Sequence, residues 1–135
     1  MRTAVDSSVL LDLLTADPEF GARSQEALDR ALGEGALLAC EVVWAEVRAF
    51  FPSANLFEGS MSELGLEFDG SDRECAARAG EAWRRYRADG GRRTALVPDF
   101  LVAAHAATRA DRLLTRDRGF TRRYFRGLRV LDSSA

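Results

Sequence analysis

The stretch TAVDSSVLLDLL, residues 3–14, joins a strand to a helix with almost no connection between them. Thr3–Asp6 is short and apolar, which favours a buried strand, and Val9–Leu14 continues with the apolar spacing of a helix. A strand that leads directly into a helix is the unit from which parallel α/β sheets are built. Such sheets place their active sites beyond the carboxyl ends of the strands, which is where Asp6 stands. The stretch therefore predicts an α/β fold with Asp6 at its functional edge.

The same alternation of short apolar strands and helices continues along the chain. Asp17-Pro18 has the form of a helix start, and Ser71–Glu74 has the form of a capping box. The expected strands are residues 36–40, 66–68, 113–115 and 129–131, and the expected helices are residues 18–32, 41–51, 55–64, 71–88 and 99–110, with a helical turn at 120–125. Because 135 residues suit one domain and no repeat or linker divides them, we expect a single domain over residues 1–135. Its architecture is predicted to be three-layer α/β/α around a small, mainly parallel central sheet.

The composition is that of an ordinary globular protein, with 47% hydrophobic and 30% charged residues. No apolar run approaches the roughly 20 residues of a membrane span, so no membrane association is expected. The first residues carry Asp6 and Asp12 within their apolar part and lack a small-residue cleavage pattern, which argues against a signal peptide. Cys40 and Cys75 are expected to be buried free thiols in a reducing cytoplasm.

All 19 basic residues are Arg, and their distribution is uneven. The absence of Lys excludes a P-loop nucleotide site and Schiff-base chemistry, because both need a Lys amine. Residues 1–70 hold four Arg against 13 acidic residues, whereas residues 71–135 hold 15 Arg against eight. A basic half suggests a phosphate-bearing partner, since Arg pairs with phosphate in a bidentate manner. A solvated helix face rich in Arg explains the charge equally well.

Four carboxylates are candidates for one acidic site. Asp6 ends the first strand, Asp117 lies two residues beyond the strand 113–115, and Asp99 begins the helix that leads into that strand. Glu46 has the apolar neighbours Val42, Val43, Ala49 and Phe50 three and four residues away, so it is expected to point into an apolar face. A carboxylate buried there needs a partner or a metal ion.

Each carboxylate also has a structural interpretation. Asp6 and Asp99 could cap helices, and Asp117 could stabilise a turn. Four carboxylates gathered at one edge would repel one another, by roughly 4 kcal/mol for a pair about 4 Å apart at an effective dielectric constant of 20. A divalent cation removes that penalty. Hard oxygen ligands without a usable Cys or His set favour Mg²⁺, with Mn²⁺ as the alternative, over zinc.

The chain resembles the PIN-domain family, and more closely the VapC-type ribonuclease toxins of bacterial type II toxin–antitoxin pairs. The resemblance rests on the order and spacing of VDSSVLLDLL, EVVWAEV, PDFLVAAHA, LLTRDRGF and RRYFRGLRVLD, which together cover nearly the whole chain. It implies that Asp6, Glu46, Asp99 and Asp117 form the catalytic metal site, with Ser8 and Thr115 as polar support. It also implies Mg²⁺- or Mn²⁺-dependent hydrolysis of RNA phosphodiester bonds, a cognate antitoxin and a homodimer.

Several further residues and functions remain open. Arg112, Arg116 and Arg118 flank Asp117 and are candidate contacts to RNA phosphates. His105 could be a general base or simply a packed side chain. The aromatic residues Trp44, Phe50, Phe51 and Phe57 are expected in the core, or lining a groove for a partner helix. Two other functions fit the same fold, namely a nuclease for RNA processing or structured DNA without an antitoxin, and an inactive interaction module.

Overall fold

A computed structural model shows five strands and six helices in the described residues, which are 1–91, 97–116 and 123–133. The strands are β1 (Arg2–Val5), β2 (Ala36–Ala39), β3 (Leu66–Phe68), β4 (Arg112–Thr115) and β5 (Val130–Asp132). The helices are α1 (Ser7–Leu14), α2 (Gly21–Glu34), α3 (Glu41–Arg48), α4 (Ala54–Glu63), α5 (Arg73–Ala88) and α6 (Val97–Arg109). No helix among these residues is long and apolar enough to cross a bilayer.

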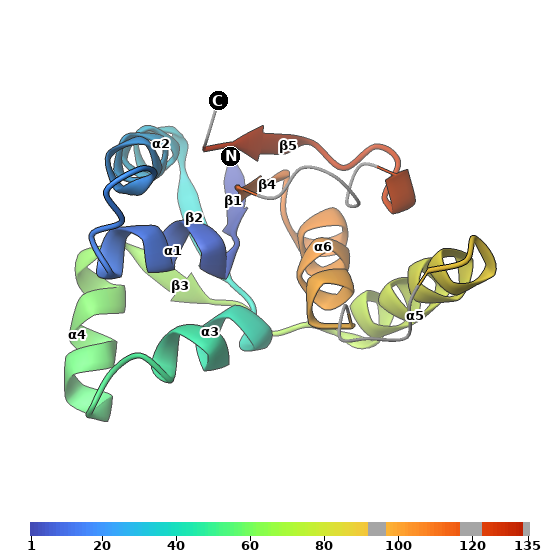
Figure 1. Cartoon of the computed structure of the whole chain (residues 1–135), viewed down its shortest axis with the longest axis horizontal. Helices are drawn as coiled ribbons and strands as arrows, with labels where there is room; N and C mark the ends of the chain where they lie inside the picture. The colour runs from blue at the N-terminus through green and yellow to red at the C-terminus, as the bar shows by residue number, and fades with distance from the viewer. Residues whose placement is uncertain (92–96, 117–122, 134–135) are drawn as a thin grey trace.

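The five strands form one parallel sheet in the order β3-β2-β1-β4-β5. Figure 1 shows α1 and α2 on one side of this sheet and α6, with α5 outside it, on the other. The predicted three-layer α/β/α architecture with a parallel sheet is therefore confirmed. The strand order reverses between β1 and β4, and α/β sheets characteristically bind ligands at such a switch point, beyond the carboxyl ends of the strands. Asp6 follows β1 at this position.

Two hydrophobic clusters hold the layers together. The larger one surrounds the sheet and includes buried side chains of β1, β2 and β4 together with Val43 and Val47 of α3. The smaller one joins α5 to α6 and to the turn at 123–125, where Phe100 contacts Tyr86 and Tyr124 edge to face at ring-centroid distances of 5.5 and 5.9 Å. Because small Ala side chains line the facing surfaces of α5 and α6, the two helices approach closely around these rings.

The aromatic residues of the middle of the chain divide between core and surface. Phe57 is buried and Trp44 packs edge to face against it at 5.3 Å, as expected for core residues. Phe51 is partly buried beside Phe57. Phe50, in contrast, is 59% exposed, so the expectation of a core position is wrong for this residue.

Two helix starts differ from the sequence-based expectation. Asp17-Pro18 does not begin α2, because the Asp17 carboxylate accepts hydrogen bonds from the Glu19 and Phe20 N–H groups and closes a separate turn before Gly21. The N-cap of α5 is Asp72 instead of Ser71, and its carboxylate accepts a bond from Cys75 N–H at 2.9 Å. Asp17 accepts bonds from backbone N–H groups as expected of a capping side chain, but before the helix starts, and Asp72 takes the capping role predicted for Ser71.

The two cysteines are buried and free, as predicted. Cys40 precedes α3 and lies within the larger cluster, where burial raises the pKa of its thiol to about 11. A thiol with so high a pKa is protonated at neutral pH, so it is a poor nucleophile and a poor metal ligand.

Candidate active site

Asp6 is held rigidly at the carboxyl end of β1. Its backbone N–H donates to Leu114 O of the neighbouring strand β4, and its Oδ1 caps α1 by accepting from Ser7 N–H at 2.8 Å. Its Oδ2 accepts hydrogen bonds from Thr115 Oγ1 at 2.8 Å and from Ser8 Oγ at 3.1 Å. Both predicted supporting residues therefore lie against Asp6. These contacts fix the orientation of the carboxylate from β1, α1 and β4 at once.

Thr115 and Ser8 occupy these positions because of strand register and helix phase. Val5 of β1 is opposite Leu114 of β4, so the next residues along, Asp6 and Thr115, meet at the edge of the sheet. Ser8 lies in the first turn of α1, where a short hydroxyl side chain can reach back to the capping carboxylate. Ser8 Oγ also accepts a bond from Arg116 N–H, which ties the residue after β4 to the same centre.

Glu46 lies beside Asp6, although not in the way the sequence suggests. The prediction that it points into an apolar face is wrong, because α3 buries Val43 and Val47, and Glu46 itself is exposed. The carboxylate turns toward α1 and accepts a hydrogen bond from Ser7 Oγ at 3.2 Å. Partial burial of the carboxyl group raises the pKa of Glu46; the Ser7 bond lowers it and the negative charge of Asp6 raises it further.

Asp99 lies in the first turn of α6, which begins two residues earlier at Val97. The residue is thus inside the helix and not at its N-cap, and a negative charge there favours the helix dipole. Its helix packs against β1, β4 and α3, the elements that carry or adjoin Asp6 and Glu46. The helix that carries Asp99 thus packs on elements of the candidate site, and Figure 1 shows α6 on the side of the sheet opposite α1.

Asp117 and Arg118 lie outside the described residues, which resume at Arg123. The last described residue before them, Arg116, donates its N–H to Ser8 Oγ. Their assignment to the site therefore stays a prediction.

The donor chemistry at Asp6 fits a hard divalent cation. Among the described residues, the side chains bonded to Asp6 and Glu46 offer only hydroxyl oxygens as further metal-ligand atoms, and no Cys or His side chain bonds to either carboxylate. Those residues contain no group of three or more acidic, His or Cys side chains close enough to hold a metal ion. Asp6 and Glu46 thus supply carboxylate oxygens for two ligands of a site. The pKa of Glu46 is raised mainly by partial burial and to a smaller extent by the Asp6 charge, and a cation would favour the ionised form of both groups.

Arg112 cannot contact RNA as predicted. Its side chain is 3% exposed, its Nε donates to Thr3 Oγ1 at 2.8 Å, and its Nη1 pairs with Glu34 at 3.3 Å. The alternation of β4 directs this side chain into the protein toward α2. The assignment of Arg112 to phosphate binding is therefore wrong, and its guanidinium instead links β1, β4 and α2.

Arg116 is engaged in an ion pair that the sequence does not reveal. Its Nε and Nη2 donate to the two carboxylate oxygens of Asp12 at 2.9 and 3.0 Å, and its guanidinium lies 4.3 Å from the centre of the Phe20 ring. Asp12 is buried in α1 and also accepts a bond from Ser24 Oγ of α2. An Asp within the apolar face of a predicted helix is the one sequence signal for such a pair, since a buried carboxylate needs a partner. Arg116 therefore has a structural role as a clamp between α1, α2 and the end of β4.

We expect Arg116→Ala to lower the free energy of unfolding by about 1–3 kcal/mol, because it leaves the buried Asp12 carboxylate without its charged partner. Denaturant melts of the single variants, of Asp12→Ala and of the double variant should show a strong coupling energy between the two residues. Arg30→Ala is the matched control, since Arg30 forms an exposed pair with Glu26 and should shift stability by less than about 0.5 kcal/mol. If the Arg116→Ala variant is as stable as the unsubstituted protein, the ion pair is not structurally important, and phosphate binding by Arg116 is favoured instead.

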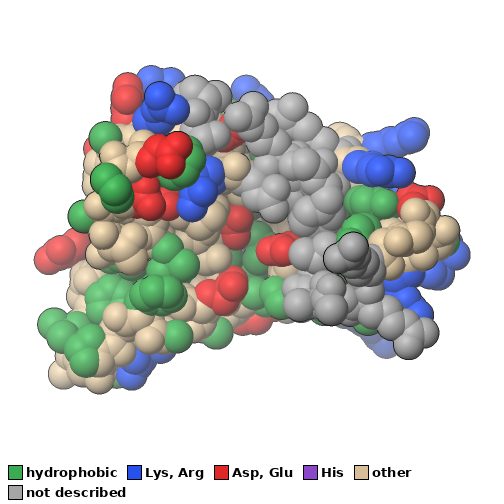
Figure 2. Space-filling model, viewed as in Figure 1, with side chains coloured by type: hydrophobic (Ala, Val, Ile, Leu, Met, Phe, Trp, Pro, Cys, Tyr) green, Lys and Arg blue, Asp and Glu red, His purple; other side chains and the backbone are tan. Residues whose placement is uncertain are grey.

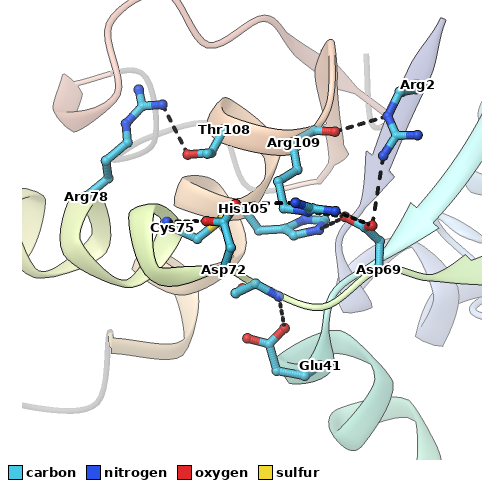
Figure 3. Close-up of polar contacts among 10 residues, drawn as sticks. Arg2, Glu41, Asp69, Asp72, Cys75, Arg78, His105, Thr108 and Arg109 are labelled. Atoms are coloured by element: carbon cyan, nitrogen blue, oxygen red, sulfur yellow. Dashed lines mark hydrogen bonds and ion pairs between the residues drawn. The ribbon is translucent and has the colours of Figure 1, made fainter.

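His105 is a packed side chain and not a solvent-exposed base. It is 1% exposed on α6, and its Nε2 lies 2.8 Å from Asp69 Oδ2 (Figure 3). Arg109, one turn further along α6, donates from Nε and Nη2 to the same carboxylate at 2.8 and 3.0 Å. The bond from Arg109, assisted by His105, lowers the pKa of Asp69 to about 2. Asp69 follows β3, so this network anchors the connection between β3 and α5 to α6.

Comparisons with known proteins agree with this geometry. The family model described as "PIN domain" matches residues 3–126. No match was found among curated proteins.

Solved structures with the same fold cover nearly the entire chain. VapBC2 from Rickettsia felis, bound to a DNA fragment from its promoter, matches with a TM-score of 0.74 at 16% identity over 98% of both chains. DNA-bound VapBC from Salmonella typhimurium matches with a TM-score of 0.73 at 15% identity, again over 98% of both chains. VapBC-5 from Mycobacterium tuberculosis, a member of the VapBC family of toxin–antitoxin systems, matches with a TM-score of 0.63 at 19% identity over 97% of this chain and 98% of that chain.

Proposed function

The chain belongs to the PIN-domain family, and on that premise we propose that it is a divalent-metal-dependent ribonuclease, the VapC-type toxin of a toxin–antitoxin pair. The observation that carries the proposal is the pairing of Asp6 and Glu46 through Ser7 at the switch point of the sheet. Partial burial and, to a smaller extent, the neighbouring Asp6 charge both raise the pKa of Glu46, and two acidic groups held together in this way are typical of functional sites. An inactive interaction module has no need of such a pair.

Asp6 has the geometry of the principal ligand in this proposal. Its Oδ1 accepts one hydrogen bond from within the described residues, from Ser7 N–H, so one lone-pair direction remains for a ligand. Its Oδ2 is held by the Thr115 and Ser8 hydroxyls, which keep the carboxylate from rotating. A bound Mg²⁺ or Mn²⁺ would supply an activated water and neutralise charge that develops on the phosphate.

Glu46 has the properties of a second ligand or of a group that orients water. Its exposed position beside Asp6 allows access from solvent, and the Ser7 hydroxyl fixes one of its oxygens. We assign Asp99 and Asp117 to the remaining carboxylate positions and Arg118 to phosphate contact. The support for Asp99 is that α6 packs on β1 and α3; for Asp117 and Arg118 it is their place directly after β4.

A cognate antitoxin is the partner we propose, because the solved structures with this fold include VapBC assemblies. The apolar surface of α4 and its neighbours supports a protein partner. Phe50, Leu56 and Phe68 are 59%, 58% and 56% exposed, and Figure 2 shows hydrophobic side chains gathered over α4 and toward α3. Large apolar side chains exposed together mark an interaction surface. We also propose that the toxin forms a homodimer through this surface. Its proposed substrate is cytoplasmic RNA.

Removal of divalent metal tests the proposed chemistry directly. We expect RNA cleavage to disappear in EDTA and to return when Mg²⁺ or Mn²⁺ is added in excess, because the site offers only oxygen donors. The measurement is a gel assay of a labelled single-stranded RNA, with the same RNA and metal without protein as control. Full cleavage in EDTA would exclude the metal mechanism, and no cleavage with either metal would exclude the nuclease.

A further inference from the structure

The outer face of α5 combines positive charge with an open groove. Gly80, Trp83, Arg84, Arg87 and Ala88 follow one another at the three- and four-residue spacing of a single helix face, and with Gly91 they line a groove of about 630 Å³. The lining thus combines the small residues Gly80, Ala88 and Gly91 with Trp83 and two Arg side chains. The guanidinium of Arg87 lies over the Trp83 ring at 5.5 Å.

A second groove continues this surface across the turn that follows the undescribed segment. It is lined by Arg85, Asp89, Arg123, Tyr124 and Arg126, and it shares Ala88 with the first groove. Arg85 reaches the turn by donating to Tyr124 O at 2.7 Å. We call the residues of both grooves the α5 arginine surface. Figure 2 shows several Arg side chains at this end of the molecule, with few Asp or Glu side chains among them.

The charge of this surface is not balanced by its own acidic residues. The two grooves are lined by one acidic residue, Asp89, and by five Arg: Arg84, Arg85, Arg87, Arg123 and Arg126. Arg84 pairs with Glu81 at 2.7 Å, and Arg123 lies 3.8 Å from Asp89. The net charge of the whole chain is −2, so the excess of positive charge is local. Such an excess on one face is the electrostatic footprint of a polyanion-binding surface.

The surface adjoins the candidate site through α6. Tyr86 of α5 contacts the ring of Phe100, which is the residue after Asp99. Tyr124, which lines the second groove, contacts the same ring and Tyr86. The α5 arginine surface is therefore linked by this aromatic cluster to the first turn of α6, which carries Asp99.

We propose that the α5 arginine surface binds the single-stranded RNA that flanks the cleavage position, with Arg84 and Arg87 on phosphates and Trp83 as a stacking platform. This inference rests on the proposed function. Trp83 is partly buried against the cluster between α5 and α6 and lines the groove with the rest of its ring. Arg side chains beside such a ring suit single strands, because unpaired bases can stack on aromatic rings while their phosphates meet the guanidinium groups. A base-paired duplex would keep its bases away from Trp83.

The test is the salt dependence of RNA binding by the metal-free protein in EDTA, where no cleavage is expected. Each phosphate contact to a single strand contributes about 0.7 to the slope of log K against log salt, so Arg84→Gln with Arg87→Gln should reduce the slope by about 1.4. At about 0.1 M salt the same two contacts correspond to about 25-fold weaker binding. Arg30→Gln is the matched control, because Arg30 also forms an exposed helical pair, with Glu26, but on α2.

A second pair of variants tests the groove without removing an Arg. A Cβ added at Gly80 meets no atom within 4 Å, so Gly80→Ala and Gly80→Glu both fit the helix. We expect Gly80→Glu to weaken RNA binding several-fold and Gly80→Ala to leave it unchanged, since only the first adds a negative charge to the groove.

The results separate the two proposals. If the protein cleaves RNA with Mg²⁺ but the double Arg variant binds RNA as tightly as Arg30→Gln does, the surface proposal is wrong and the proposed function stands. If no RNA is cleaved although the double variant loses its predicted salt slope, the nuclease is wrong and RNA binding by the surface stands. Tighter binding of duplex DNA than of single-stranded RNA, or an effect of the Arg variants on an acidic peptide alone, would also overturn the surface proposal.

Discussion

Asp6→Asn is expected to reduce RNA cleavage in Mg²⁺ on the order of 10³-fold or more without destabilising the metal-free protein. The substitution keeps the shape of the side chain and removes the negative charge that would hold the cation. Oδ1 of the Asn can still accept the Ser7 N–H bond that caps α1, and the Ser8 and Thr115 hydroxyls can rotate to accept from the new amide group. Thermal melts in EDTA should therefore match those of the protein itself or lie higher, since repulsion of Glu46 is relieved.

A titration gives an independent readout of the same variant. Asp6 is one cause of the raised pKa of Glu46, so Asp6→Asn should move that pKa back toward 4.5, as measured by the carboxyl chemical shift. Asp29→Asn is the control, because Asp29 lies exposed on α2 and pairs only with Gln25 among the described residues. The carboxylate would be purely structural if the Asp6→Asn variant melted well below the unsubstituted protein in EDTA and still cleaved RNA in Mg²⁺.

Asp69→Ala is expected to have the largest effect on stability, a loss of about 3 kcal/mol, or roughly 10 °C in Tm. The variant leaves the buried ring of His105 without its acceptor and removes the carboxylate that Arg109 contacts twice (Figure 3). The connection from β3 to α5 would lose its anchor on α6. Asp29→Ala should change the free energy of unfolding by less than about 0.5 kcal/mol. Equal melting temperatures for Asp69→Ala and Asp29→Ala would contradict the assignment.

The pH dependence of the same variant has a defined sign. The pKa of Asp69 is lowered from 3.8 to about 2, so its contribution to stability is present above pH 3.8 and is lost as the pH falls toward 2. The amount is about 2 kcal/mol, given 1.36 kcal/mol per pKa unit. Urea melts between pH 5 and pH 2 should therefore show a steeper loss for the protein itself than for Asp69→Ala. Parallel curves would mean that Asp69 has the same pKa in the folded and unfolded states.

The two carboxylate centres differ in what balances their charge. Asp69 is surrounded by Arg109, His105 and Arg2, and its pKa falls. Glu46 is partly buried beside another acid, Asp6, and both burial and that charge raise its pKa. A carboxylate that is neutralised by its own protein stabilises the fold, whereas one left beside a second carboxylate is suited to bind a cation. This contrast separates a structural charge cluster at Asp69 from the candidate active site at Asp6 and Glu46.

The sequence predicted the alternation of elements well because short apolar runs and helical spacing are local properties. All five strands lie within one residue or two of the expected segments, and α3, α4 and α6 follow the expected helices. The helix starts were less certain because Asp17 and Asp72 can each cap several nearby N–H groups, and the surrounding packing selects which one.

The sequence by itself determined the α/β fold and the place of Asp6 at the end of β1, because apolar runs and helical spacing are local properties. The support from Ser8 and Thr115 was implied by the family resemblance, and the structure places both hydroxyls on the Asp6 carboxylate. Only the tertiary structure decided the partners of the other charged residues. Arg112 turns inward to Glu34, Arg116 pairs with Asp12, and His105 with Asp69, across sequence separations that no local pattern records. The exposure of Glu46 likewise depends on which face of α3 packs against the core, because Glu46 and the buried Val47 are adjacent positions on the helix. Charge pairing over long separations follows from packing, because a long side chain takes whichever opposite charge the packed elements bring within reach.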